Sequence, residues 1–316
     1  MQNTPMRNYS FDTLKLICAI LVIFAHTPQP EIWENQITPL IRCAVPIFFM
    51  ISGYFTYGKK DITHTIHKRI RQLLTIFGVV FLLYFSVFLI VNGKDSLEHL
   101  SVLLSHNFIL LNTVPFSMHL WYIAAYIYVL LIILLVERFN LYKWLFFIIP
   151  ILLLTGLLIG KYSEILLDHY FPPNYTRNFL LTGLPFFTLG MIIKKAKKLP
   201  NIYVAAISCI VFYILGIIEF PSFEDLGMYW VSTIFLSLSI FILFTNIKQV
   251  KDNIFSKIGR EDSLYIYLLH YIIAIGITLL SNTFSYLPYF STLVTLLLTL
   301  VLIYILRKLK IIGKII

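Results

Sequence analysis

Ionisable residues inside apolar stretches are the first candidates for chemistry in this sequence. Lys15 and His26 share one apolar stretch, Arg42 lies in the next, and His119 and His270 lie in later ones. Such side chains are costly inside a bilayer, so those that occur there commonly serve a function. Histidine is suited to proton transfer at neutral pH, because its ordinary pKa is about 6.5. His26 is therefore the candidate general base.

The same residues have simpler interpretations. Lys15 can extend its amine to the inner membrane surface, and a histidine at a membrane interface can sit at headgroup depth. Arg42 can bind lipid phosphate, but it is expected near the outer side, where cations are disfavoured. Lys15 and His26 are eleven residues apart, so they share a helix face about 16 Å apart. We expect His26 near the outer end of its helix and His270 nearer the cytoplasm.

A basic cluster lies at residues 64–71, HTIHKRIR. It contains Lys68, Arg69 and Arg71. Basic clusters beside a membrane helix often contact anionic lipid. Arg and Lys also pair strongly with phosphate groups. The cluster is therefore either a lipid-binding segment or a phosphate clamp for a nucleotide-bearing donor.

The composition requires these residues to be carried by membrane-spanning helices. Hydrophobic residues make up 59% of the chain and charged residues 13%, against about 25% charged in soluble domains. Spans need roughly 20 mostly apolar residues. The sequence therefore predicts an all-α integral membrane protein with about ten spans. These are expected at 11–27, 38–57, 70–92, 117–136, 143–160, 178–193, 200–219, 227–246, 262–281 and 287–306.

Two segments are expected to be irregular. The stretch 97–112 is less apolar and favours an interfacial or re-entrant helix over an eleventh span. The second span carries Pro46 and the pair Ser52-Gly53. Proline kinks helices, and small residues allow close helix packing. This span is therefore either a broken helix that lines a cavity or a helix with a packing kink.

The distribution of cations predicts the topology. Of the 25 Lys and Arg residues, twenty fall in loops on one side of the ten spans, and only Lys94, Lys161 and Arg177 fall on the other. The positive-inside rule then places both termini in the cytoplasm. It also explains the formal charge of +10 without nucleic acid. Three cysteines in apolar stretches predict neither disulfides nor a metal site. We expect one membrane-embedded domain over residues 1–316.

Five segments resemble one family of membrane enzymes. FDTLKLICAILVIFAH (11–26), RCAVPIFFMISGYF (42–55), HLWYI (119–123), PFFTLGMII (185–193) and SLYIYLLH (263–270) are similar, in this order, to the acyltransferase-3 family. The resemblance implies about ten helices and a catalytic histidine at His26. The family usually has Arg where this chain has Lys15, and Arg-x-x-Arg where it has Lys68 and Arg71. Some members of the family carry a fused esterase-like or racemase domain.

The resemblance implies a membrane O-acyltransferase of the bacterial cytoplasmic (inner) membrane. It would move an acyl group, commonly acetyl, from cytoplasmic acyl-coenzyme A to an extracytoplasmic or lipid-linked carbohydrate, with no metal. A small hydroxyl or amino acceptor is also open, and glycan-synthesis proteins are possible partners. In this interpretation Arg42, His119 or Tyr122 would polarise the carbonyl or orient His26. Lys15, Lys68, Arg69 and Arg71 would bind the donor.

Two other functions fit the sequence. One is a secondary transporter or flippase for a glycan or lipid-linked intermediate, since ten spans, a broken helix and buried cations also suit transport. The other is a non-catalytic sensor or scaffold. Acyl turnover by the purified protein would separate the enzyme from both.

Overall fold

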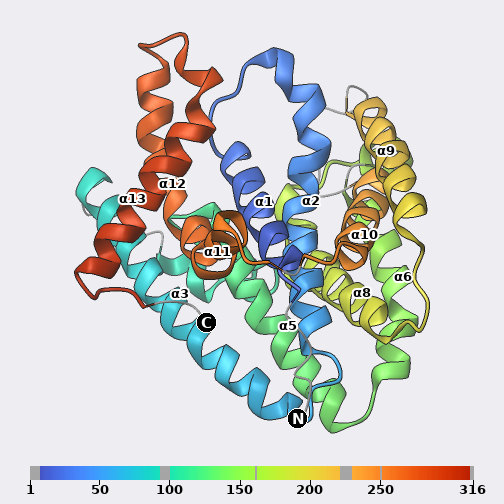
Figure 1. Ribbon diagram of the computed structural model, residues 1–316. Coiled ribbons are helices and arrows are strands. Elements are labelled where there is room, and N and C mark those ends of the chain that lie inside the picture. Colours follow the sequence, from blue (N-terminus) through green and yellow to red (C-terminus); the bar gives the residue numbers. More distant parts are fainter. Residues whose placement is uncertain (1–7, 93–99, 161, 221–229, 250, 314–316) are drawn as a thin grey trace. The chain divides into compact units, whose positions relative to one another are not determined.

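The computed structural model describes residues 8–92, 100–160, 162–220, 230–249 and 251–313, and all regular structure in these ranges is helical. Figure 1 shows the arrangement of the longer helices. These are α1 (Ser10–Phe24), α2 (Glu31–Thr56), α3 (Ile62–Asn92), α5 (Trp121–Arg138), α6 (Tyr142–Ile159), α8 (Leu184–Lys195), α9 (Ile202–Glu219), α10 (Val231–Asn246), α12 (Ser263–Ser281) and α13 (Ser291–Lys308). Shorter helical segments are α4 (His106–Ile109), η2 (Met118–Leu120), α7 (Ser163–Leu167), η3 (Pro173–Tyr175), η4 (Phe179–Gly183), α11 (Ile254–Glu261) and η5 (Leu287–Tyr289).

Seven helices within the described ranges are long and apolar enough to cross a membrane. They are α2, α3, α5 with η2, α6, α9, α12 and α13. Each of the ten predicted spans coincides with a helix, but α1, α8 and α10 have only 15, 12 and 16 residues. The all-helical fold is therefore confirmed, with several helices that suit a membrane. The count of ten spans and the cytoplasmic termini stay predictions.

The chain divides into two compact units that alternate along the sequence. The first unit contains residues 1–48, 199–222 and 232–316, and the second contains residues 49–198 and 223–231. The boundary falls within α2, so this helix contributes its first part to one unit and its last part to the other. This division does not test the prediction of one domain over residues 1–316, which stays a prediction.

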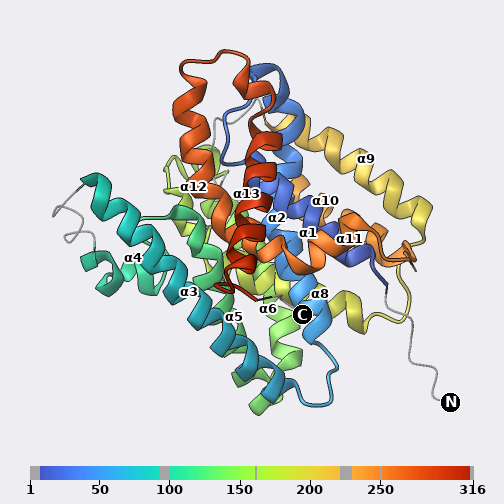
Figure 2. The same ribbon diagram turned by 60° about the vertical axis from the view of Figure 1, so that its left-hand side comes forward.

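In the first unit, α1 packs against α11, α12 and α13 (Figure 1, Figure 2). Two hydrogen bonds join the start of α1 to the end of α10 and the segment after it. Ser10 Oγ donates to the carbonyl of Phe244, and Thr13 Oγ1 donates to Gln249 Oε1. Helix α11 approaches α1 closely at Gly259. A Cβ atom there would lie 1.8 Å from the carbonyl oxygen of Asp12, so only glycine permits this contact.

In the second unit, two glycines bring the end of α2 against α8. A Cβ on Gly53 would lie 1.8 Å from the carbonyl oxygen of Phe187, and one on Gly190 would lie 2.0 Å from that of Met50. Helix α2 continues without interruption through Pro46, so the broken-helix alternative is not found. The Ser52-Gly53 pair instead serves the close packing that small residues allow.

The sixth predicted span, 178–193, is formed by two helical segments. The π-helix η4 leads into α8, where Pro185 occupies the first turn. Proline is tolerated there because the first amides of a helix have no intrahelical acceptor. Pro185 therefore lies where the π-helix η4 gives way to α8. In the stretch 97–112, residues 97–99 lie outside the described residues, and the rest forms only short helical turns.

Candidate functional site

The site begins where α1 ends. The helix stops at Phe24, three residues before the predicted end, and His26 follows in the turn. The His26 ring centroid lies 5.3 Å from that of His270 and 5.3 Å from that of Tyr271. Sequence position suggested different depths for the two histidines. Because α1 is short, its end instead reaches the side of α12 at His270.

The turn after α1 is held by hydrogen bonds to the start of α13. Thr27 Oγ1 lies 3.0 Å from Thr292 Oγ1, and both residues are buried. Gln29 Nε2 donates to both hydroxyls, at 2.8 and 2.9 Å. Ser291 Oγ donates to the carbonyl of Pro28. These contacts fix the backbone on the C-terminal side of His26 and so limit where its ring can lie.

His270 is fully buried in α12, and its hydrogen bond defines its tautomer. Nδ1 lies 3.0 Å from the carbonyl oxygen of Ile266. A carbonyl only accepts, so Nδ1 carries the proton, and in the neutral ring Nε2 carries the lone pair. The acceptor nitrogen of His270 is therefore Nε2, the ring nitrogen that does not bond to the Ile266 carbonyl.

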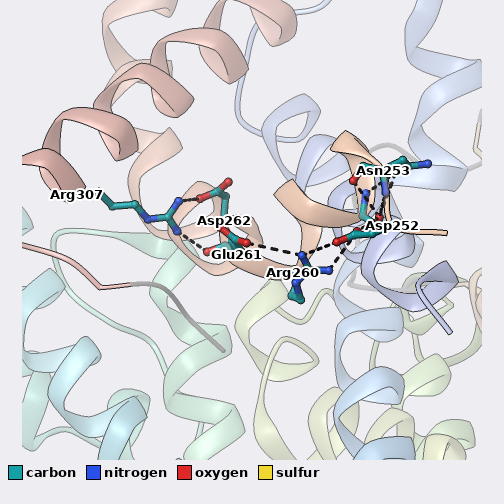
Figure 3. Close-up of polar contacts among 7 residues, drawn as sticks. Asp252, Asn253, Arg260, Glu261, Asp262 and Arg307 are labelled. Atoms are coloured by element: carbon teal, nitrogen blue, oxygen red, sulfur yellow. Dashed lines mark hydrogen bonds and ion pairs between the residues drawn. The ribbon is translucent and has the colours of Figure 1, made fainter. Parts of the chain in front are cut away.

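Charged contacts lie at both ends of α11 (Figure 3). Arg260 Nη2 lies 2.8 Å from Asp252 Oδ2, and Arg307 Nη1 lies 2.5 Å from Asp262 Oδ1. Arg307 also donates to the carbonyl of Glu261. These pairs join α11 to the segment before it and to the end of α13. Outside the spans, hydrogen bonds from Arg260 lower the pKa of Asp252 to about 2.

Lys15 is paired within its own helix. Its Nζ lies 3.0 Å from Asp12 Oδ1, and the carboxylate is buried while the lysine is partly exposed. An adjacent carboxylate offsets the cost of a charge in an apolar region. This contact gives Lys15 a structural partner, and its predicted role toward the donor stays a prediction.

The three predicted cations of α3 differ in their surroundings. Arg69 points into the second unit, where Nη1 donates to Thr56 Oγ1 at 3.1 Å and to the Tyr126 hydroxyl at 2.9 Å. Lys68 and Arg71 are exposed. In the turn before α3, burial and then the charge of Arg69 lower the pKa of Lys59. Two cations thus lie near each other at this end of the second unit.

His119 and Tyr122 also belong to the second unit. His119 is buried in η2, with Nδ1 2.6 Å from Ser117 Oγ and its ring centroid 5.1 Å from that of Tyr84. Tyr122 is buried in α5 with its ring centroid 4.7 Å from that of Phe49. Both side chains are thus held in defined positions.

Arg42 lies in the first unit, half-buried near the middle of α2. Helix α2 begins at Glu31, before the predicted span, so Arg42 lies well inside the helix, and its place near the outer side of the membrane stays a prediction. The four predicted catalytic residues are therefore divided, with His26 and Arg42 in one unit and His119 and Tyr122 in the other. Sequence reasoning did not include His270 in the site. The sequence feature that could have indicated His270 is an imidazole inside a predicted span, at the end of the segment SLYIYLLH (263–270).

Comparison with known proteins agrees with this architecture. A family model described as an acyltransferase domain, Acyl_transf_3, matches residues 8–308. The chain belongs to the acyltransferase-3 family. The match includes all ten long helices, and with them His26 and His270.

Named relatives of this acyltransferase-3 chain are longer proteins. It is 26% identical over 335 residues to an amino-acid racemase of Enterococcus faecalis, with 96% of this chain and 46% of that protein covered. It is 27% identical over 325 residues to a serine/alanine racemase of Enterococcus gallinarum, with 94% and 45% covered. The chain thus spans about half the length of these curated relatives. No solved structure matches it.

Proposed function

We propose that this chain is a membrane O-acyltransferase that uses acyl-coenzyme A, with acetyl as the expected group. The proposal rests on one observation within a chain of this family: the His26 ring is held against His270 and Tyr271 at the end of a short helix. A histidine held in place, with a second imidazole beside it, is suited to moving a proton at neutral pH.

The proposed reaction needs one proton carrier. His26 accepts the proton of an acceptor hydroxyl while that oxygen bonds to the thioester carbonyl carbon. The carbon–sulfur bond then breaks, the sulfur leaves with the electron pair, and the thiolate takes the proton back from His26. Each proton and electron pair is accounted for, and no metal is required. Arg42, His119 and Tyr122 stay candidates for stabilising the oxyanion.

The donor would bind through its phosphates at the second unit. Lys68 and Arg71 are exposed one helical turn apart, so both can reach one phosphate group. Lys59, close to Arg69, adds a cation that sequence reasoning did not select. We assign Lys68 and Arg71 to donor binding, and Arg69 to holding this end of the second unit together.

The acceptor class has two candidates. Carbohydrate follows from the resemblance, with glycan-synthesis proteins as partners and the bacterial cytoplasmic membrane as the location. The racemase names of the relatives introduce a second candidate, a small amino acid with a hydroxyl or amino group. Both present the nucleophile that the proposed reaction needs.

The test uses the full-length protein purified in detergent or lipid nanodiscs. The protein is incubated with acetyl-coenzyme A, and coenzyme A release is followed with a thiol reagent in the presence and absence of candidate acceptors. We expect release that depends on the protein and a product that is heavier by one acetyl group. If no thioester is consumed with any acceptor, the enzyme proposal fails.

Transport is the second candidate, and the amino-acid names of the relatives favour testing it. Proteoliposomes containing the chain are given labelled serine or alanine without acyl-coenzyme A. We expect no protein-dependent uptake if the chain is a transferase. Saturable uptake without thioester turnover would instead show a transporter.

A further inference from the structure

We infer that His270 is the positioning residue for His26: it fixes the tautomer of the base through its acceptor nitrogen. This inference rests on the proposed function and adds a residue that the sequence did not place in the site. The observations behind it are the contact between the two rings and the hydrogen bond that defines the tautomer of His270.

The contact is made by elements that are held independently. His26 is placed by the end of α1 and by the bonds of Thr27 and Gln29 to α13. His270 is placed by α12 and by its bond to the Ile266 carbonyl. The ring centroids are 5.3 Å apart and the planes are tilted by 44°. The structure shows this ring contact, and a hydrogen bond from His26 to Nε2 of His270 is the part that we infer.

The chemical consequence follows from the tautomer. Nδ1 of His270 is committed to a carbonyl, so only Nε2 can accept a proton from a neighbouring group. A proton of His26 directed toward this nitrogen leaves the other nitrogen of His26 as the base. In serine hydrolases an aspartate does the same for the catalytic histidine. Here a neutral imidazole would replace the carboxylate, which suits a buried position because no charge has to be desolvated.

Other polar groups lie on the helices packed around the pair. On α12, Tyr267 and Tyr271 pack beside His270, and a phenol oxygen is a weaker hydrogen-bond acceptor than an imidazole nitrogen. From α13, Thr292 and Ser291 are engaged with the turn after α1, and the buried hydroxyl of Thr295 is a weaker acceptor than an imidazole nitrogen. The carboxylate on α1, Asp12, is paired with Lys15. Of these groups, His270 is the one that both contacts the His26 ring and has an acceptor nitrogen defined by a hydrogen bond.

A matched pair of variants separates the acceptor nitrogen from side-chain volume. His270→Gln keeps an acceptor oxygen near the position of Nε2, whereas His270→Leu fills similar space without one. Both lose the bond to Ile266, so that loss cancels in the comparison. We expect His270→Leu to lower kcat about tenfold or more, with KM for acyl-coenzyme A within about twofold. His270→Gln should recover much of the rate.

The second measurement needs no acyl transfer. Diethyl pyrocarbonate modifies unprotonated imidazole nitrogen, and peptide mapping isolates His26 among the eight histidines. We expect His26 to react several-fold more slowly in His270→Leu than in the wild type, and at a rate close to the wild type in His270→Gln. Equal rates in all three proteins would overturn the inference. If the Leu variant alone is slowed but no thioester is ever consumed, the pairing stands and the proposed function falls.

Discussion

At the scale of single residues, neighbouring cations on α3 have different tasks. Arg69 is bonded to a buried threonine hydroxyl and to the phenol of Tyr126, and so connects α2, α3 and α5. Arg71, two residues later, is exposed. Since consecutive positions on a helix face different directions, spacing alone assigned one role to residues that the fold separates.

This division predicts opposite outcomes for two matched substitutions. Arg69→Gln removes charge-assisted bonds from a mostly buried group, so it should destabilise the protein by about 1–3 kcal/mol and lower the Tm in detergent by several degrees. Arg71→Gln should leave the Tm unchanged and raise KM for acyl-coenzyme A several-fold, with an effect that weakens at high salt. A loss of stability in Arg71→Gln without any change in KM would refute the assignment.

At the scale of elements, glycines determine how closely helices approach. Gly190 lies against the backbone of Met50, which cannot move aside as a side chain can. Gly78, in α3 of the same unit, differs, because a Cβ atom added there would meet no described residue outside its own stretch of helix within 4 Å. Alanine is a better helix former than glycine by about 1 kcal/mol when the added methyl group has room.

We therefore expect Gly190→Ala to lower the thermal stability by several degrees and Gly78→Ala to leave it unchanged or raise it slightly. The measurement is unfolding of both variants in the same detergent, followed by fluorescence. Equal stability of the two variants would show that α2 and α8 are not packed as closely as described.

The contact between Asp252 and Arg260 at α11 makes the stability of the protein depend on pH in the acid range. The pKa of Asp252 is lowered from 3.8 to about 2 by hydrogen bonds from Arg260 and Ser256. A lowered pKa means that the folded state favours the ionised form, so this contribution is fully present above about pH 4 and is lost as the pH falls toward 2. The pair is exposed, so the effect is small.

Asp252→Asn should consequently make the thermal stability less dependent on pH in the acid range. We expect the Tm difference between pH 5 and pH 3 to be smaller in this variant than in the wild type, at low salt. Asp61→Asn, in the turn before α3, is measured beside it as a matched change of carboxylate to amide. An identical acid dependence in the wild type and Asp252→Asn would exclude the contribution of this pair.

The sequence predicted where the long helices lie more accurately than where they begin and end. Hydropathy located all ten long helices because each contains a continuous apolar stretch. It extended α1 to residue 27, although Pro28 disfavours helix in the residues before it. It began α2 at 38 because the first turns, Glu31 to Gln36, contain more polar than apolar residues. Polar side chains beyond the apolar stretch do not prevent a helix from continuing, so hydropathy alone underestimates its length.

The pairing of His26 with His270 was not predictable in the same way. The two residues are 244 positions apart, and their contact depends on α1 ending early and on α13 holding the turn that follows. The early end of α1 and the contacts of α13 depend on tertiary packing, which composition and periodicity do not predict. The sequence did indicate that each imidazole is unusual, because each lies within or at the end of an apolar stretch.

At the scale of the whole molecule, ten spans would leave both termini in the cytoplasm. Cysteine labelling with a membrane-impermeant maleimide tests this in a variant without Cys18, Cys43 and Cys209. We expect Lys310→Cys to be labelled only after the membrane is permeabilised, and His169→Cys, in a loop predicted outside, to be labelled in intact cells. Labelling of Lys310→Cys in intact cells would require a different number of spans or the opposite orientation.

The central claim is that His26 carries the proton in acyl transfer. The direct test measures acetyl-coenzyme A turnover by His26→Gln and by His169→Gln, both purified with the wild-type elution profile. His169 is exposed and serves as the matched control. We expect turnover to fall about a hundredfold or more in His26→Gln and to stay at the wild-type rate in His169→Gln. Undiminished turnover by His26→Gln would contradict the account.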